Sequence, residues 1–217
     1  MQMSAKTSWA TALVIAGLAV SFVLTEILFG HDRARLALET HAVMEGQVYR
    51  LITGHFAHIS RHHTILSIAS VLLVGVLLFP VLRPSRLLAT IAASLCAISF
   101  GWMILQPGGI TYVGFSGIVH GLLGAGALLF LRDGPKWLGW ALFAGLAVKL
   151  GFESLQGPVP GVGEAIAGRV STLSHALGAL GGIFIAPWHP GAKPVLLLVA
   201  MLAVWAALRH EALLVDL

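Results

Sequence analysis

The feature that most constrains this chain is a series of apolar stretches, each about as long as an α-helix must be to cross a lipid bilayer. A membrane-spanning helix needs roughly 20 mostly apolar residues. Such stretches recur between short polar or Gly- and Pro-containing segments, and they cover residues 9–29, 62–82, 87–106, 115–131, 137–153, 170–187 and 194–209. The chain has 58% hydrophobic and only 10% charged residues, too little polar surface for a water-soluble domain of 217 residues. The sequence therefore predicts an all-α integral membrane protein.

Basic residues between the predicted spans indicate how the chain is oriented. Cytoplasmic loops of membrane proteins carry an excess of Lys and Arg. Residues 107–114 contain no basic residue, whereas alternate short loops are basic and contain Arg83, Arg86, Arg132, Lys136 and Lys193. We therefore expect the N-terminus and the basic loops on the cytoplasmic side, although arginines in the long first loop oppose this orientation. The net charge of +4 then reflects topology, and we expect a lipid bilayer and no nucleic acid as partner.

Histidines and serines lie within or beside the predicted spans in three places. Polar and ionisable residues inside a bilayer are costly, so each of them is a candidate functional residue. The first group leads into the second span and reads GHFAHISRHHTILS, with His55, His58, His62, His63 and Ser67. The second group is Gly114-Phe115-Ser116-Gly117 followed by His120, and the third is His175 within STLSHALGALGG. The second and third groups begin spans that start on the same side of the membrane.

Ser116 and His175 form the most informative pair. A serine hydroxyl becomes a nucleophile when a base takes its proton, and a neutral imidazole is the usual base near pH 7. Both residues lie near the starts of their spans, so we expect them at similar depth. Small residues three or four positions apart would let the two helices pack closely, and these are Gly117, Gly121, Gly124, Gly178 and Gly182. Backbone N–H groups at the start of the serine's helix could hold an oxyanion.

Other interpretations of the same residues stay open. A serine between glycines at a helix start is often only an N-cap, and a transmembrane histidine often only bonds a neighbouring helix. His120 follows Ser116 by one helical turn and could be the base instead of His175. The histidines before the second span could bind a metal, but His58 and His63 are poorly spaced for one helical face, and no cysteine or carboxylate reinforces the cluster. We therefore expect no metal site.

The order and spacing of these motifs resemble those of the rhomboid family of intramembrane serine proteases. The resemblance covers about residues 45–187. His58 and His63 lead into the second span as His-x4-His, Gly-x-Ser-Gly opens the fourth, and His175 begins a His-x2-Gly-x3-Gly pattern in the sixth. The detailed sequences are similar to the bacterial rhombosortase branch; they are GQVYRLITGHFAHISRHH, YVGFSGIVHGLL and VSTLSHALGALGG. The resemblance implies a single membrane domain over residues 1–217, a six-helix rhomboid-like bundle with an additional C-terminal transmembrane helix.

The resemblance also implies roles for individual residues. Ser116 and His175 would form a catalytic dyad without a carboxylate as third member, and the N–H of Ser116 and the side chain of His63 would hold the oxyanion. Further support for the oxyanion or the substrate would come from His58, Gly114, Gly117 and His120. Rhomboids usually have an asparagine four residues after the second histidine, where this chain has the shorter Ser67. Loss of one oxyanion donor typically lowers the rate by about 10²- to 10³-fold, so a weak or inactive protein that binds transmembrane clients is the alternative.

As a rhomboid-like enzyme, the chain is expected to cleave transmembrane protein substrates without a cofactor. Resemblance to the rhombosortase branch implies that the substrate is the C-terminal tail of an exported protein, made of a Gly-Gly motif, a transmembrane helix and a basic end. The acyl-enzyme would react with water or be transferred to an amine. The protein would lie in the inner (cytoplasmic) membrane of a bacterium, with its site open to the periplasmic side.

Two further sets of polar residues have more than one interpretation. Lys149 and Glu153 are four residues apart in the fifth span, so their side chains can meet on one helix face. We favour an ion pair between them, and contact of Glu153 with a cationic or amine group from the non-cytoplasmic side is the alternative. His55, His58 and His62 could line a route for water to the site or have a structural or interfacial role.

Overall fold

The computed structural model describes residues 5–106, 110–187 and 189–215 of the chain. Within these segments it is all-helical and contains no β-strand, as the sequence predicts. The helices are α1 (Ala5–Phe29), the 3-10 helix η1 (Arg33–Arg35), α2 (Thr40–Met44), α3 (Arg50–Thr53), α4 (Arg61–Leu78), α5 (Pro84–Leu105), α6 (Ser116–Asp133), α7 (Lys136–Gln156), α8 (Val162–Ile166), α9 (Thr172–Ile185) and α10 (Lys193–Val215).

The long helices α1, α4, α5, α6, α7, α9 and α10 match the predicted spans in order and place. Their boundaries differ by a few residues for local reasons. Helix α4 ends at Leu78, before the predicted limit at residue 82, because Pro80 has no backbone N–H with which to continue the hydrogen bonds of the helix. By length and composition, α1, α4, α5 and α7 are the helices of the described chain that can cross a membrane, and α9 and Lys193–Leu208 are shorter apolar helices.

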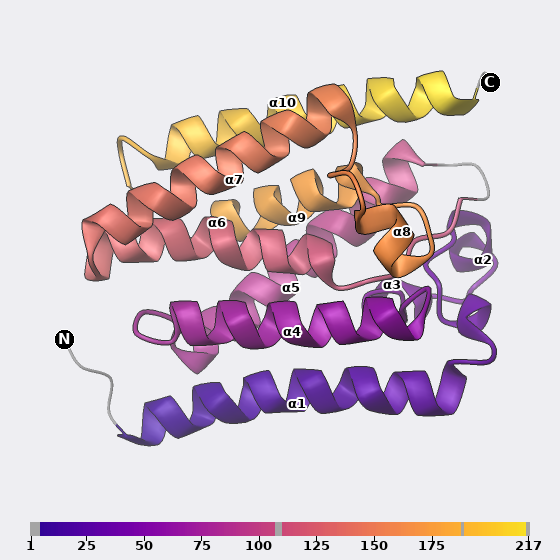
Figure 1. Cartoon of the computed structure of the whole chain (residues 1–217), viewed down its shortest axis with the longest axis horizontal. Helices are drawn as coiled ribbons and strands as arrows, with labels where there is room; N and C mark the ends of the chain where they lie inside the picture. The colour runs from indigo at the N-terminus through magenta and orange to yellow at the C-terminus, as the bar shows by residue number, and fades with distance from the viewer. Residues whose placement is uncertain (1–4, 107–109, 188, 216–217) are drawn as a thin grey trace.

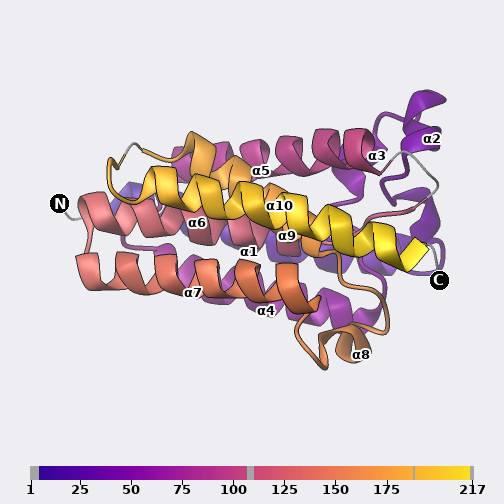
Figure 2. The same ribbon diagram turned by 90° about the horizontal axis from the view of Figure 1, so that it is seen from above.

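The long helices lie side by side and alternate in direction (Figures 1 and 2). The connections α4–α5, α6–α7 and α9–α10 lie at one end of the bundle, together with the start of α1. The first loop with α2 and α3, the start of α6, and the segment with α8 lie at the opposite end. The short basic loops therefore share one end of the bundle, and Ser116 begins α6 at the other end.

Helices α6 and α9 form the centre of the bundle. Fourteen of the 18 residues of α6 are buried, whereas α1, α4, α7 and α10 expose many large apolar side chains on their outer faces. A Cβ atom added to Gly178 would collide with the carbonyl of Gly117, and one added to Gly182 would collide with the carbonyl of Gly121. The backbones of α6 and α9 are therefore in direct contact along these glycines.

The first loop is anchored to the segment that leads into α6. Leu38 pairs with Tyr112 through two backbone hydrogen bonds, and the N–H of Gly114 donates to the carbonyl of Gly54 at 2.9 Å. The guanidinium of Arg50 donates to the carbonyls of Ala34 and Ala37, both at 2.7 Å. These bonds hold the start of α6 in a fixed position at its end of the bundle.

Candidate active site

Ser116 is the first residue of α6, and the turn before it requires glycine. Gly114 has φ +121°, a conformation that side chains disfavour, and its carbonyl accepts a 2.6 Å hydrogen bond from the Tyr112 hydroxyl. A Cβ at Gly114 would also lie 2.9 Å from the ring of His63. Ser116 itself is only partly buried. The turn therefore leaves Ser116 partly accessible and sets Gly114, two residues before it, against the ring of His63.

His175 lies within hydrogen-bonding distance of Ser116. Helix α9 begins after Ser171, whose hydroxyl accepts from the N–H of Ser174 at 3.1 Å and caps the helix. His175 follows within the first turns of α9 and is buried, and its Nε2 is 3.0 Å from Oγ of Ser116. The structure thus brings together the two residues that the motifs pair across 59 positions of sequence.

A carboxylate occupies the other side of the His175 ring. Oε2 of Glu153, on α7, is 2.9 Å from Nδ1 of His175, and Glu153 is only 2% exposed. Its other oxygen, Oε1, accepts from Nζ of Lys149 at 2.5 Å, which is the ion pair that the sequence predicts. The predicted dyad without a carboxylate is therefore wrong in one respect, because a carboxylate lies beside His175. A carboxylate accepts only, so Nδ1 carries the proton and Nε2 presents a lone pair to the Ser116 hydroxyl.

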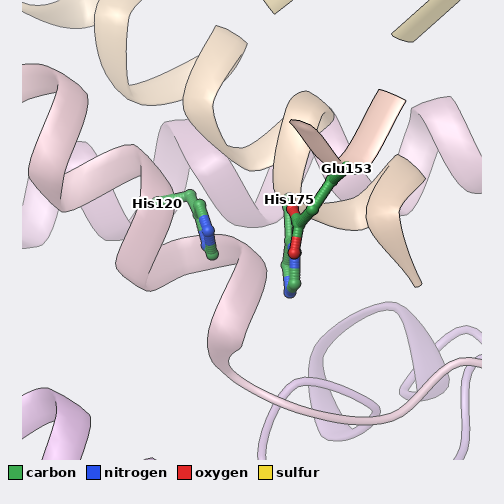
Figure 3. A group of neighbouring side chains, drawn as sticks. All are labelled: His120, Glu153 and His175. Atoms are coloured by element: carbon green, nitrogen blue, oxygen red, sulfur yellow. Dashed lines mark hydrogen bonds and ion pairs between the residues drawn. The ribbon is translucent and has the colours of Figure 1, made fainter. Parts of the chain in front are cut away.

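His120 stacks on His175 instead of facing the serine hydroxyl. The two ring centroids are 4.1 Å apart and the ring planes differ by 15°. Nδ1 of His120 is 2.8 Å from the carbonyl oxygen of Ser116, so this nitrogen donates a proton to the backbone. His120 therefore supports the His175 ring from α6, and its geometry does not make it the base for Ser116 (Figure 3).

His63 has a side-chain N–H group beside the turn that precedes α6. The backbone N–H of Ile59 donates to Nδ1 of His63 at 3.3 Å, so Nδ1 is an acceptor and the ring proton lies on Nε2. The hydroxyl of Ser60 caps α4 by accepting from the N–H of His63 at 3.2 Å. Ser67 lies one turn further along α4, on the same helix face as His63, and it is buried.

The other histidines of the first group lie in different surroundings. His55 is fully buried, and its Nε2 is 2.9 Å from Oγ of Ser99, while burial lowers the pKa of this imidazole to about 3. The ring of His58 lies edge-on to the ring of His63, with centroids 4.9 Å apart, and His62 is exposed on α4. His55 is therefore held as a neutral hydrogen-bonding group, and the three histidines lie in three different environments.

His120, Glu153 and His175 are the one group in the described part of the chain whose ligand atoms lie close enough for a metal ion. The site's own hydrogen bonds oppose this use. Near-parallel stacked imidazoles direct their lone pairs along parallel planes, which does not give the converging ligands of a tetrahedral site. Both nitrogens of His175 are also engaged, with Ser116 and Glu153. The residues present do not fit a resident ion.

Comparison with known proteins identifies the family of the chain. A family model described as the rhomboid domain matches residues 45–189, two thirds of the chain. The chain belongs to the rhomboid family. Rhomboids are intramembrane serine proteases, so this is a multi-pass membrane protein of a protease family that acts on transmembrane substrates. Neither a search of curated proteins nor a search of solved structures returned a significant match.

Sequence reasoning did not place Glu153 against His175. Its signal was an acidic residue within an apolar span, which is costly unless the charge is paired. Lys149, one turn earlier in the same helix, already provides a partner of opposite charge, so nothing in the sequence indicated a second partner for Glu153. The contact with His175 joins α7 to α9 and depends on how these helices pack.

Proposed function

We propose that this rhomboid is an active intramembrane serine endopeptidase in which Ser116 is the nucleophile and His175 is the general base. The observation that carries the proposal is the 3.0 Å contact between Ser116 Oγ and His175 Nε2, the nitrogen left without a proton by the bond from Nδ1 to Glu153. A base within hydrogen-bond reach of a serine and itself held by a third group is the arrangement that activates a serine hydroxyl.

The chemistry follows from these positions. Ser116 Oγ attacks the carbonyl carbon of the scissile peptide while its proton moves to Nε2 of His175. The tetrahedral intermediate collapses, the C–N bond breaks, and the imidazolium gives its proton to the leaving amine. A water molecule then attacks the acyl-enzyme while His175 takes its proton. As the ester bond breaks, His175 returns this proton to Ser116 Oγ, which restores the free enzyme. An amine in place of water would give a transfer product by the same steps.

The oxyanion of the intermediate would form at the start of α6. The first N–H groups of a helix have no acceptor within the helix, and Ser116 is the first residue of α6. The Nε2–H of His63 would be a second donor, since its ring lies against Gly114, two residues before the serine. Ser67 on the next turn of α4 would contribute little because its side chain is short. We therefore expect a modest rate, because each missing donor costs about 10²- to 10³-fold.

The proposed substrate is a C-terminal tail with a Gly-Gly motif, a transmembrane helix and a basic end, as in the rhombosortase branch. Support comes from the motif TGHFAH before α4 and from His120 after the Gly-x-Ser-Gly. We place the protein in the inner membrane of a bacterium with Ser116 towards the periplasm. The basic loops at the opposite end of the bundle support this orientation, because such loops remain in the cytoplasm.

A cleavage assay tests the proposal. The purified protein is reconstituted in lipid with a single-pass fusion protein that ends in such a tail, and cleavage is followed by mass. Ser116→Ala and His175→Ala should abolish cleavage, while His62→Ala, at an exposed position on α4, should keep it. Full activity of either active-site variant would overturn the mechanism. Cleavage of an unrelated transmembrane helix at an equal rate would overturn the substrate assignment alone.

A further inference from the structure

Glu153 is a buried acidic residue with a complete set of partners. Its Oε2 faces His175 Nδ1 and its Oε1 faces Lys149 Nζ, so each oxygen has one donor. An ionised carboxylate removed from water costs several kcal/mol unless it is paired, and removal of one partner leaves that cost uncompensated. The side chain of Lys149 is 38% exposed, whereas that of Glu153 is buried, so the carboxylate depends on its two partners. This is a site in which a carboxylate can stay ionised beside the histidine.

The carboxylate also controls which nitrogen of His175 carries the proton. Because Glu153 accepts from Nδ1, Nε2 stays unprotonated and can accept the Ser116 proton. When His175 gains that proton, the imidazolium forms 2.9 Å from the carboxylate. His120 stacks on one face of the same ring and fixes its plane. The ring is therefore held both in orientation and in tautomer before the substrate arrives.

The net charge of Lys149, Glu153, His175 and the reacting group stays the same during the reaction. In the resting site the charges of Lys149 and Glu153 cancel while His175 is neutral. In the tetrahedral intermediate, the new imidazolium is matched by the new oxyanion. The net charge is zero in both states, which matters in a site of low dielectric constant, where an unbalanced charge is most costly.

We propose that Glu153 is a positioning residue that makes the site a Ser116–His175–Glu153 triad, with Lys149 holding the carboxylate. This inference rests on the proposed function, because it concerns the base for Ser116. The other possible role of Glu153 is only to tie α7 to α9 through an ion pair. The two roles differ in what happens when the carboxylate becomes an amide of the same shape.

The variant Glu153→Gln separates the two roles because of Lys149. A lysine ammonium only donates hydrogen bonds, so the glutamine oxygen would face Lys149 and the NH₂ group would face His175. The amide would then donate to Nδ1 of His175 and move the ring proton to Nε2. With a proton on Nε2, His175 can no longer accept the proton of Ser116. A wrong tautomer costs about 10⁴-fold in serine-protease triads, and we expect a loss of about 10²- to 10⁴-fold here.

The measurement is the inactivation of the reconstituted protein by a fluorophosphonate, which reports the nucleophilicity of Ser116 without a known substrate. Glu153→Gln should lower the maximal inactivation rate and leave the half-saturating concentration and the melting temperature nearly unchanged. Glu153→Asp, which keeps the charge, should label faster than Glu153→Gln. Adding Lys149→Met to Glu153→Gln should raise the rate above that of Glu153→Gln alone, because the amide is then free to turn its oxygen to Nδ1.

The outcomes separate the inference from the proposed function. If the wild type labels no faster than Ser116→Ala, the proposed function itself fails. If the wild type labels and Glu153→Gln labels within about twofold of it, the triad is wrong and the Ser116–His175 pair stands. If the variant with both Lys149→Met and Glu153→Gln is labelled no faster than Glu153→Gln alone, Glu153 does not control the tautomer of His175. A lower melting temperature together with a higher half-saturating concentration would show a structural ion pair only.

Discussion

Replacing Gly178 by alanine tests whether direct contact between α6 and α9 sets the distance between Ser116 and His175. A Cβ at this position would collide with the carbonyl of Gly117, the residue next to Ser116. Real Cβ atoms essentially never lie within 3.0 Å of another heavy atom, and a backbone carbonyl inside a helix cannot turn aside. Because the interior is close-packed, the two helices must separate by on the order of 1 Å.

That separation predicts two measurable losses. The 3.0 Å contact between Ser116 and His175 would lengthen, and a misplacement of about 1 Å costs about 10²-fold in rate. Overpacking also lowers the free energy of unfolding by about 1–3 kcal/mol. Cleavage of the fusion substrate and the midpoint of thermal unfolding report the two effects separately.

The matched control is Gly145→Ala on α7. Gly145 is also helical, but a Cβ there would meet no atom within 4 Å, so this change should leave the rate unaltered. Wild-type cleavage and wild-type thermal stability in Gly178→Ala would refute the reasoning, since they would mean that backbone contact does not set the active-site distance. Equal losses in both variants would point instead to a general effect of glycine replacement.

Three further predictions concern the residues around the dyad. Ser67→Asn should raise kcat by up to about 10²-fold by supplying the oxyanion donor usual in rhomboids, and an unchanged kcat would contradict the role given to this position. His120→Phe should keep most of the activity because a ring still stacks on His175, whereas His175→Phe should be inactive; the reverse pattern would make His120 the base. Exhaustive treatment with a chelator should change neither the fluorophosphonate labelling rate nor the melting temperature, and a loss of either would require a metal ion.

The membrane architecture could be predicted from the sequence because it depends on one strong, local property. A helix that crosses a bilayer must be apolar over roughly 20 residues, and that requirement is visible without knowledge of any contact. The limits of the helices depend on weaker local signals. Pro80 shortened α4 relative to its apolar stretch, and the hydroxyls of Ser60 and Ser171 mark the starts of α4 and α9 by capping them.

The site could be predicted only where the spacing of residues along the chain matched a known motif. Glycines and a serine at the start of α6, and a histidine followed by glycines in α9, were enough to pair Ser116 with His175. The tautomer of each imidazole could not be predicted, because it depends on a partner from another part of the chain. Glu153 is the clearest case: its i,i+4 partner Lys149 was visible in the sequence, and its contact with His175 arises only when α7 packs beside α9.

The most direct test of the account is to locate the covalent adduct of a fluorophosphonate by peptide mass spectrometry in the protein reconstituted in lipid. The account predicts one adduct, on Ser116, formed in the wild type and absent or at least about 10²-fold slower in His175→Ala. An adduct on any other residue, or labelling of His175→Ala at the wild-type rate, would contradict the claim that His175 activates Ser116.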